Sequence, residues 1–207
     1  MSFASGFRGT ANGSVQSAYT DQPGVAVAGM LAFAGDLNNI DSLMVDETNG
    51  IAAGKGVVAV QQAAVATNLQ RPNQAISLPS GYMTYADFAG VVVFEQAMQT
   101  DENGNPGWAD NRQARVLRPG RAGGRIYVDA KDTITTTDGV HWVILAPEDG
   151  SYALGDFSPT ALSGGAAGHT VLLPNVRWVT PGVNGDKVII ELLGDVIAGG
   201  FVDDSNS

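Results

Sequence analysis

The sequence predicts an all-β protein, with a jelly-roll-like or β-sandwich domain and an extended N-terminal arm. Short apolar runs alternate with turn dipeptides, among them Asn49-Gly50, Asp138-Gly139 and Asn184-Gly185, and this is the pattern of strands joined by hairpins. The 27 glycines and 9 prolines among 207 residues disfavour helices, because neither residue stabilises a helix interior. A sandwich, a jelly roll or a barrel accommodates such a pattern.

Residues 1–22 form the predicted arm. They are rich in Ser, Gly, Ala, Asn and Thr and show no apolar periodicity, so we expect the free segment to be mobile. The segment nevertheless carries Phe3, Phe7 and Tyr19. Spaced aromatic side chains suit an arm that docks on a neighbouring protein, with Phe3, Phe7 and Arg8 as its binding residues. A poorly ordered terminus is the alternative.

Residues 23–202 form the predicted β-domain, and residues 203–207 a short acidic tail. The Gly-, Ser-, Pro- and Asp-rich segment 146–168 is predicted to be a loop excursion between strands. Gln61–Leu69 has the alanine content of a helix but also fits an extended segment. Apolar, β-branched and aromatic residues predict strands within Val25–Phe33 and at Leu43–Val45, Val57–Val60, Gly90–Gln96, Arg125–Ala130, His141–Leu145, His169–Leu173 and Lys187–Leu193.

Charge and composition exclude several kinds of partner. The formal net charge of −10, from 21 acidic and 11 basic residues, argues against nucleic acid, which needs a basic face. No apolar run approaches the ~18 residues of a membrane helix, and the first residues lack the regions of a secretory signal, so no membrane partner is expected. The absence of Cys fits assembly in a reducing cytoplasm. Because 44% of residues are hydrophobic and only 15% charged, we expect partner proteins to cover part of the surface.

No residue pattern indicates catalysis. His141 and His169 are the only histidines, and neither stands beside a nucleophile motif or in a metal-binding spacing. The scattered carboxylates single out no pair for glycoside hydrolysis. Asp101–Asn105 has oxygen ligands around a glycine but lacks the spacing of a calcium loop, so it is predicted to be a hairpin tip. We expect a non-enzymatic protein without a metal or cofactor.

One cluster of charge stands out within residues 112–125, which hold five of the eight arginines: Arg112, Arg115, Arg118, Arg121 and Arg125. Arginine pairs with carboxylates through two parallel hydrogen bonds, which suits it to protein interfaces. Because the rest of the chain is acidic, the cluster is predicted to meet an acidic patch on a partner or on another copy of the chain. The alternative is an exposed loop whose arginines pair with carboxylates of their own chain.

Three blocks of the sequence follow a known pattern in order. Gln22–Gly29 leads from the arm into the first strand, Phe88–Val93 forms a Phe-Ala-Gly-Val-Val strand, and Val116–Arg121 forms a Val-Leu-Arg-x-Gly-Arg turn before the strand at Gly124–Val128. Together these blocks resemble the cement (decoration) proteins of bacteriophage capsids. Here the turn and its strand are further apart than in that family, so either Arg121 or Arg125 takes the position of the last arginine.

The resemblance implies a small β-domain on the outside of an icosahedral head, where it bridges neighbouring subunits of the major capsid protein as a dimer or trimer. It implies no cofactor and no catalysis, and it implies a place in the virion after synthesis in the cytoplasm of the bacterial host. Two other functions remain open. One is another β-type virion component, such as a tail-tube or connector protein. The other is a carbohydrate-binding β-sandwich, with Trp108 at the surface and Trp142 and Trp178 in the core.

Overall fold

The computed structural model describes residues 26–33, 40–61, 74–95, 99–100, 106–120, 124–163 and 169–194. The predicted arm, the acidic tail, the Asp101–Asn105 tip and the alanine-rich segment after Gln61 lie outside these residues. Among the described residues, no helix has the length and apolar character needed to cross a membrane.

The all-β prediction is confirmed, and each predicted strand corresponds to an observed one with shifted ends. One short 3-10 helix, η3, accompanies the strands of the described chain. The elements are β1 (Leu31–Phe33), β2 (Ile40–Val45), β3 (Ile51–Ala52), β4 (Gly56–Gln61), β5 (Gln74–Ser77), η3 (Tyr85–Asp87), β6 (Phe88–Val92), β7 (Gln99–Thr100), β8 (Pro106–Trp108), β9 (Gln113–Leu117), β10 (Gly124–Asp129), β11 (Gly139–Val143), β12 (Phe157–Ser158), β13 (Thr170–Trp178) and β14 (Lys187–Leu192).

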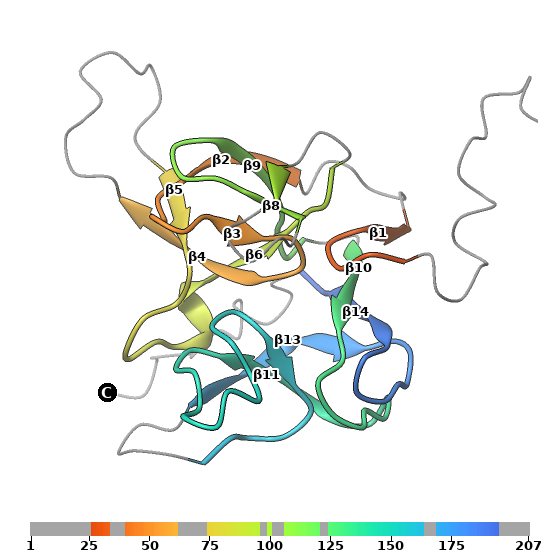
Figure 1. Cartoon of the computed structure of the whole chain (residues 1–207). Helices are drawn as coiled ribbons and strands as arrows, with labels where there is room; N and C mark the ends of the chain where they lie inside the picture. Colours follow the sequence, from red (N-terminus) through yellow and green to blue (C-terminus); the bar gives the residue numbers. More distant parts are fainter. Residues whose placement is uncertain are drawn as a thin grey trace, which may run out of the picture.

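Five strands close a small barrel in the order β2-β5-β4-β6-β9, which forms the upper half of Figure 1. The pair β2–β5 is parallel, and the other pairs of the barrel are antiparallel. Closure leaves these strands with no free edge within the barrel. A small sheet, in the order β3-β8-β7, lies beside it.

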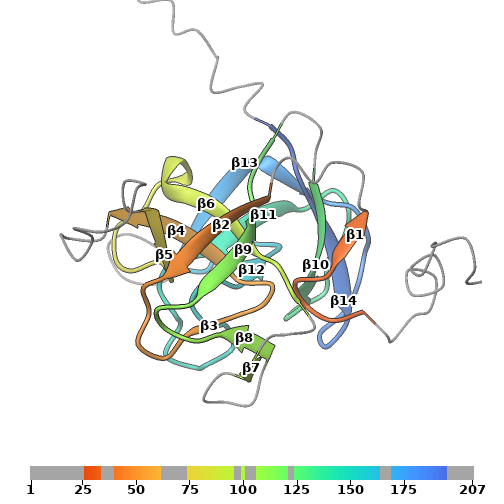
Figure 2. The same cartoon turned by 90° about the horizontal axis from the view of Figure 1, so that it is seen from above.

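The second half of the molecule is an antiparallel sheet of six strands, in the order β1-β10-β14-β13-β11-β12. Its strands β11 and β13 lie below the barrel in Figure 1, and the view from above in Figure 2 shows β1, β10 and β14 along one side. The short strand β12 lies within the segment 146–168 that the sequence predicts as a loop excursion. The sequence pattern misses it because only two residues pair, Phe157 with Trp142 and Ser158 with His141.

The strand β6 separates two hydrophobic cores. Ala89 and Val92 belong to the core inside the barrel, whereas Phe88 and Val91 belong to the core between the barrel and the six-stranded sheet. All five residues of β6 are buried, which explains its continuous apolar sequence. At Gly90, φ is +146° and an added Cβ would stand 2.3 Å from the Leu117 carbonyl oxygen, so this close approach of β6 to β9 requires glycine.

Candidate interaction surfaces

The structure divides the arginine cluster between the two halves of the molecule. β9 follows a strict alternation in which Ala114 and Val116 are buried and Gln113 and Arg115 are exposed. Arg112 and Arg118 flank this strand on the barrel, while Arg125 lies on β10 of the six-stranded sheet. The segment is therefore a barrel strand with charged flanks, and the alternative of an exposed loop is wrong for residues 113–117. Arg121 lies outside the described residues, as do Phe3, Phe7 and Arg8.

Two of the barrel arginines pair with carboxylates of their own chain. Arg115 Nε lies 2.8 Å from Glu95 Oε1, and Arg118 Nη1 lies 2.8 Å from Asp41 Oδ2. These pairs follow the alternative interpretation of the cluster, in which the charges are satisfied internally. Exposed ion pairs stabilise a fold by only about 0–1 kcal/mol, so a partner's carboxylates can replace them at little cost.

On the six-stranded sheet, Glu191 holds two arginines at once. Arg125 Nε donates to Glu191 Oε1 over 2.9 Å, and Arg177 Nε donates to Oε2 over 2.6 Å. Burial on its own raises the pKa of Glu191, but the hydrogen bonds from Arg177 and Arg125 outweigh it and leave the pKa below the usual range. The clamp joins β10, β13 and β14, so Arg125 has a structural role.

Arg112 differs from the other arginines of the cluster. Its side chain is exposed, and within the described part of the chain it makes no ion pair with a carboxylate. Its backbone is fixed, because its carbonyl accepts the amide of Val45 over 2.8 Å and its amide donates to Ala109 over 3.2 Å. The preceding Asn111 adopts a left-handed conformation with φ of 58° that closes this turn. A rigid backbone thus presents an unpaired guanidinium to solvent.

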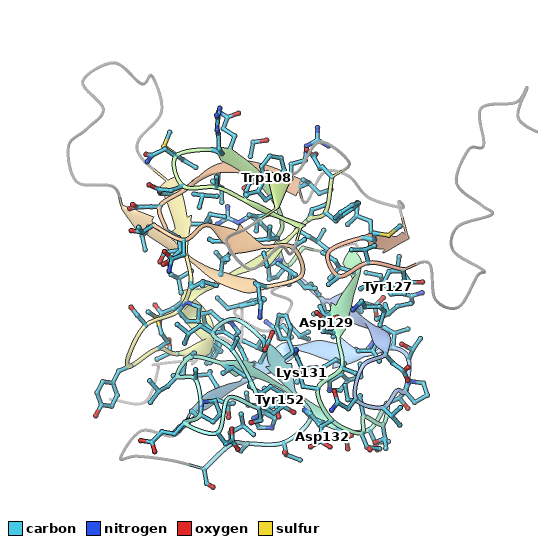
Figure 3. All side chains as sticks on the ribbon, in the orientation of Figure 1. Trp108, Tyr127, Asp129, Lys131, Asp132 and Tyr152 are labelled. Carbon is cyan, nitrogen blue, oxygen red and sulfur yellow. The ribbon has the colours of Figure 1, made fainter. Side chains whose placement is uncertain are left out.

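The histidines, carboxylates and tryptophans that the sequence offers for catalysis or binding do not form a common site among the described residues. His141 lies on β11, where burial lowers its pKa, and the described residues hold no group of three His, Asp or Glu side chains suited to a metal. Trp142 and Trp178 are buried, as predicted. Trp108 is half-buried against the barrel core and its indole donates to the Val93 carbonyl over 3.4 Å, at the opposite end of the molecule from Tyr152 and Asp132 (Figure 3).

One surface feature was not predicted from the sequence, the loop of residues 78–87 between β5 and β6, here termed the tyrosine loop. It projects beside the six-stranded sheet in Figure 1. Tyr82 and Tyr85 are 83% and 56% exposed, the highest values among the large hydrophobic side chains of the described residues. The Ser80-Gly81 turn signal immediately before two tyrosines is the sequence feature that marks this loop.

Comparison with solved structures finds a similar fold. A chain of "The capsid of Myoviridae Phage XM1" superposes with a TM-score of 0.53 and 13% sequence identity, over 81% of this chain and 89% of the other. At this identity the similarity defines the fold. No curated protein matches the sequence. The comparison therefore defines the class of this protein by its fold alone, as an all-β protein with the fold of that chain.

The sequence identifies the family more closely. The family described as "Structural cement protein (E217 gp24/Pam3 gp6)" matches residues 15–193, which include every described strand. The chain belongs to this family of phage structural cement proteins. It is a structural component of the virion that stabilises the capsid, as the sequence resemblance implies.

Proposed function

We propose that the protein binds the outer surface of an icosahedral phage head and holds neighbouring subunits of the major capsid protein together at their junctions. The family match over residues 15–193 carries this proposal. The protein acts as a dimer or trimer, without catalysis or a cofactor, after synthesis in the host cytoplasm. Many copies on one shell turn weak individual contacts into a large combined stabilisation, because contacts that are linked through the lattice reinforce one another.

The arm, residues 1–22, supplies one contact. An extended segment gains affinity when its backbone adds hydrogen bonds at the edge of a partner sheet. Phe3 and Phe7 anchor the arm in apolar pockets of the adjacent coat subunit, and Arg8 pairs with a carboxylate there.

The arginines around β9 supply a second contact. Arg112 presents an unpaired positive charge on the barrel, and Arg115 and Arg118 exchange their exposed ion pairs with Glu95 and Asp41 for carboxylates of the partner. The surface of the coat protein that receives them carries carboxylates, and Arg121 adds to the same contact. Arg125 contributes indirectly, because its hydrogen bond to Glu191 fixes β10 in place and its guanidinium is therefore not available to the partner.

The test is co-sedimentation of the purified protein with undecorated shells of its phage, beside a variant that lacks residues 1–22. We expect the full-length protein to saturate the shell at a fixed ratio and to raise its melting temperature, and the truncated protein to bind weakly. Failure of the full-length protein to bind contradicts the proposal. Native mass then separates the alternatives, since a ring indicates a tail-tube or connector component. A glycan signal that Trp108→Ala abolishes indicates carbohydrate binding.

A further inference from the structure

The tyrosine loop exposes more aromatic surface than any other described part of the molecule. Tyr82 is 83% exposed and Tyr85 56%, and neither ring stacks on another aromatic ring of the described residues. Burying an aromatic side chain is among the largest single contributions to a protein interface, and tyrosine is enriched at the residues that dominate binding. These two rings gain that contribution only when another surface covers them.

The backbone that carries the two tyrosines is held from several sides. Glu47 Oε2 accepts the amide of Leu78 over 3.3 Å, and Met83 packs against the core between the barrel and the sheet. Asp87 Oδ2 accepts both the amide of Thr84, over 2.8 Å, and its hydroxyl, over 2.9 Å. The buried Phe88 follows directly. A loop that is already ordered loses little entropy on binding, so the contact is preformed.

The loop is also free of charge until its last residue. Residues 74–86 include no Asp, Glu, Lys or Arg, and the carboxylate of Asp87 is taken up by Thr84. An uncharged aromatic surface binds through burial and does not depend on ion pairing. The chain belongs to a family of phage structural cement proteins, so the capsid lattice is a surface available to cover these rings. The family match therefore favours the coat protein as the partner.

We propose that the tyrosine loop is a preformed contact that inserts Tyr82 and Tyr85 into an apolar pocket of the capsid lattice formed by the coat protein. This inference rests on the proposed function and names a surface on the globular domain that is separate from the arm and from the arginines. The two rings fill the pocket, and the burial of their aromatic surface supplies the affinity.

The experiment measures the binding of the full-length protein and of Tyr82→Ser/Tyr85→Ser to undecorated shells by co-sedimentation at 0.15 M and 0.5 M salt. The matched control is Val183→Ser, which removes a 55% exposed apolar side chain from a turn elsewhere on the surface. We expect the double variant to raise the Kd for the shell on the order of tenfold or more at both salt concentrations, because hot-spot aromatics act through burial. Val183→Ser and Tyr82→Phe are expected to keep most of the affinity, and the melting temperature of the free double variant to stay unchanged.

Each outcome decides a separate point. If the original protein binds the shell and the double variant binds equally well, the tyrosine loop inference is wrong while the proposed function stands. If the original protein does not bind, both are wrong. If the double variant loses affinity and also changes mass by sedimentation velocity in the absence of shells, the loop contacts a second copy of the chain, which overturns the choice of partner.

Discussion

Phe88 meets Trp142 edge to face, with ring centroids 5.2 Å apart and an angle of 71° between the ring planes. Phe88 belongs to β6 of the barrel and Trp142 to β11 of the six-stranded sheet, so this pair joins the two halves of the molecule. Phe157 completes the contact, its ring centroid lying 6.3 Å from that of Phe88. Gly56 makes room for both partners, since an added Cβ would stand 2.6 Å from Trp142 Nε1 and 3.0 Å from Phe157 Cζ.

Truncation of Phe88 tests whether this contact holds the halves together. We expect Phe88→Ala to lower the free energy of unfolding by about 3–5 kcal/mol, because it removes a buried ring and leaves a cavity between two rigid layers. Tyr85→Ala is the matched control, since Tyr85 stands three residues earlier and is 56% exposed. Its effect is expected to stay within about 0.5 kcal/mol. Urea denaturation measures both, and equal effects would contradict this view of the interface.

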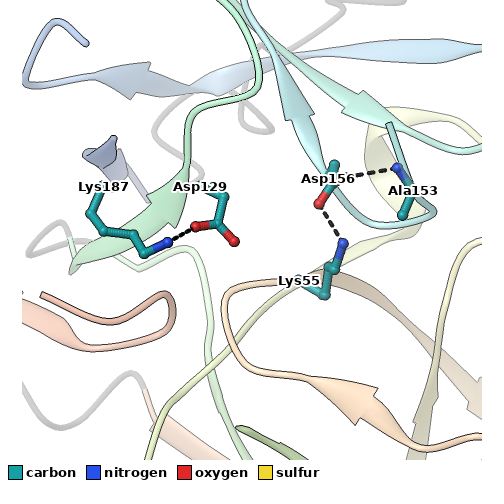
Figure 4. A network of polar contacts seen from close by, with 5 residues as sticks. All are labelled: Lys55, Asp129, Ala153, Asp156 and Lys187. Carbon is teal, nitrogen blue, oxygen red and sulfur yellow. Dashed lines mark hydrogen bonds and ion pairs between the residues drawn. The ribbon is translucent and has the colours of Figure 1, made fainter. Parts of the chain in front are cut away.

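A partly buried ion pair crosses the same junction. Lys55 precedes β4 of the barrel, and its ammonium group pairs with Asp156, whose side chain is 6% exposed and precedes β12 (Figure 4). The second carboxylate oxygen of Asp156 accepts the amide of Ala153 over 2.8 Å. Lys187 and Asp129 form a comparable pair in the same view, but their side chains are 33% and 37% exposed.

The two lysines therefore differ in their expected contribution to stability. Lys55→Met leaves a buried carboxylate without its counter-charge, and we expect a loss of about 2–4 kcal/mol. Lys187→Met removes a solvent-screened pair and is expected to cost at most about 1 kcal/mol. Adding Asp156→Asn to Lys55→Met removes the unpaired charge and restores part of the loss. Thermal unfolding of the original protein, the two single variants and the double variant measures these differences in stability. A double variant less stable than Lys55→Met would show that the unpaired Asp156 carboxylate is not the cause of the loss.

Much of the fold was predictable because local sequence determines it. The β-branched run Lys187–Leu193 and the alternation in Arg125–Ala130 predict β14 and β10 with ends shifted by one residue. The closed barrel was not predictable, since closure depends on which strands pair. The parallel pairing of Met44 with Ala75 leaves no signal in either strand. The strand β9 was not predicted because a run rich in exposed arginines is also typical of a loop, although Gln113–Val116 alternates as a half-buried strand does.

The residues of the arginine surface could be predicted from the sequence, but their positions in the fold and their ion-pair partners could not. The arginine cluster was visible as a run of residues, but the carboxylates that pair with it lie far along the chain, as Asp41 does for Arg118 and Glu191 for Arg125. Spacing in sequence contains no information about such distant pairs. The exposure of Tyr82 and Tyr85 was not predictable from the sequence, because tyrosine is intermediate in its tendency to be buried. Their exposure follows from the packing of Met83 and Phe88 beneath them.

The Glu191 clamp makes stability depend on pH. Because Arg177 and Arg125 lower its pKa in the folded state, the stabilisation is complete above the pKa of an unfolded glutamate, about 4.3, and is lost as the pH falls through the lower folded value. We expect Glu191→Gln to reduce the free energy of unfolding by about 1–2 kcal/mol at pH 7, since both arginines remain partly solvated. The difference between the two proteins should shrink as the pH falls below about 4. Urea unfolding from pH 3 to 7 measures it, and a difference constant over that range would contradict the clamp.

Arg112 offers the sharpest test of the arginine surface, because its loss disturbs no ion pair of the described chain. We expect Arg112→Ala to leave the free energy of unfolding within about 0.5 kcal/mol of the original, as for most exposed substitutions. Binding to the shell should weaken on the order of tenfold at 0.15 M salt, and this loss should diminish at higher salt, where charge contacts are screened.

Lys131→Ala is the matched control for Arg112→Ala, since Lys131 is also exposed and lies in the segment between β10 and β11, away from the barrel arginines. If the two substitutions weaken binding equally, the shell responds to total charge and the surface around β9 has no special part. Arg112→Lys tests whether the shell recognises the charge of Arg112 alone or also the geometry of its guanidinium. It keeps the charge but loses the paired hydrogen bonds of a guanidinium, so intermediate affinity indicates a carboxylate partner bound in the two-point geometry that arginine favours.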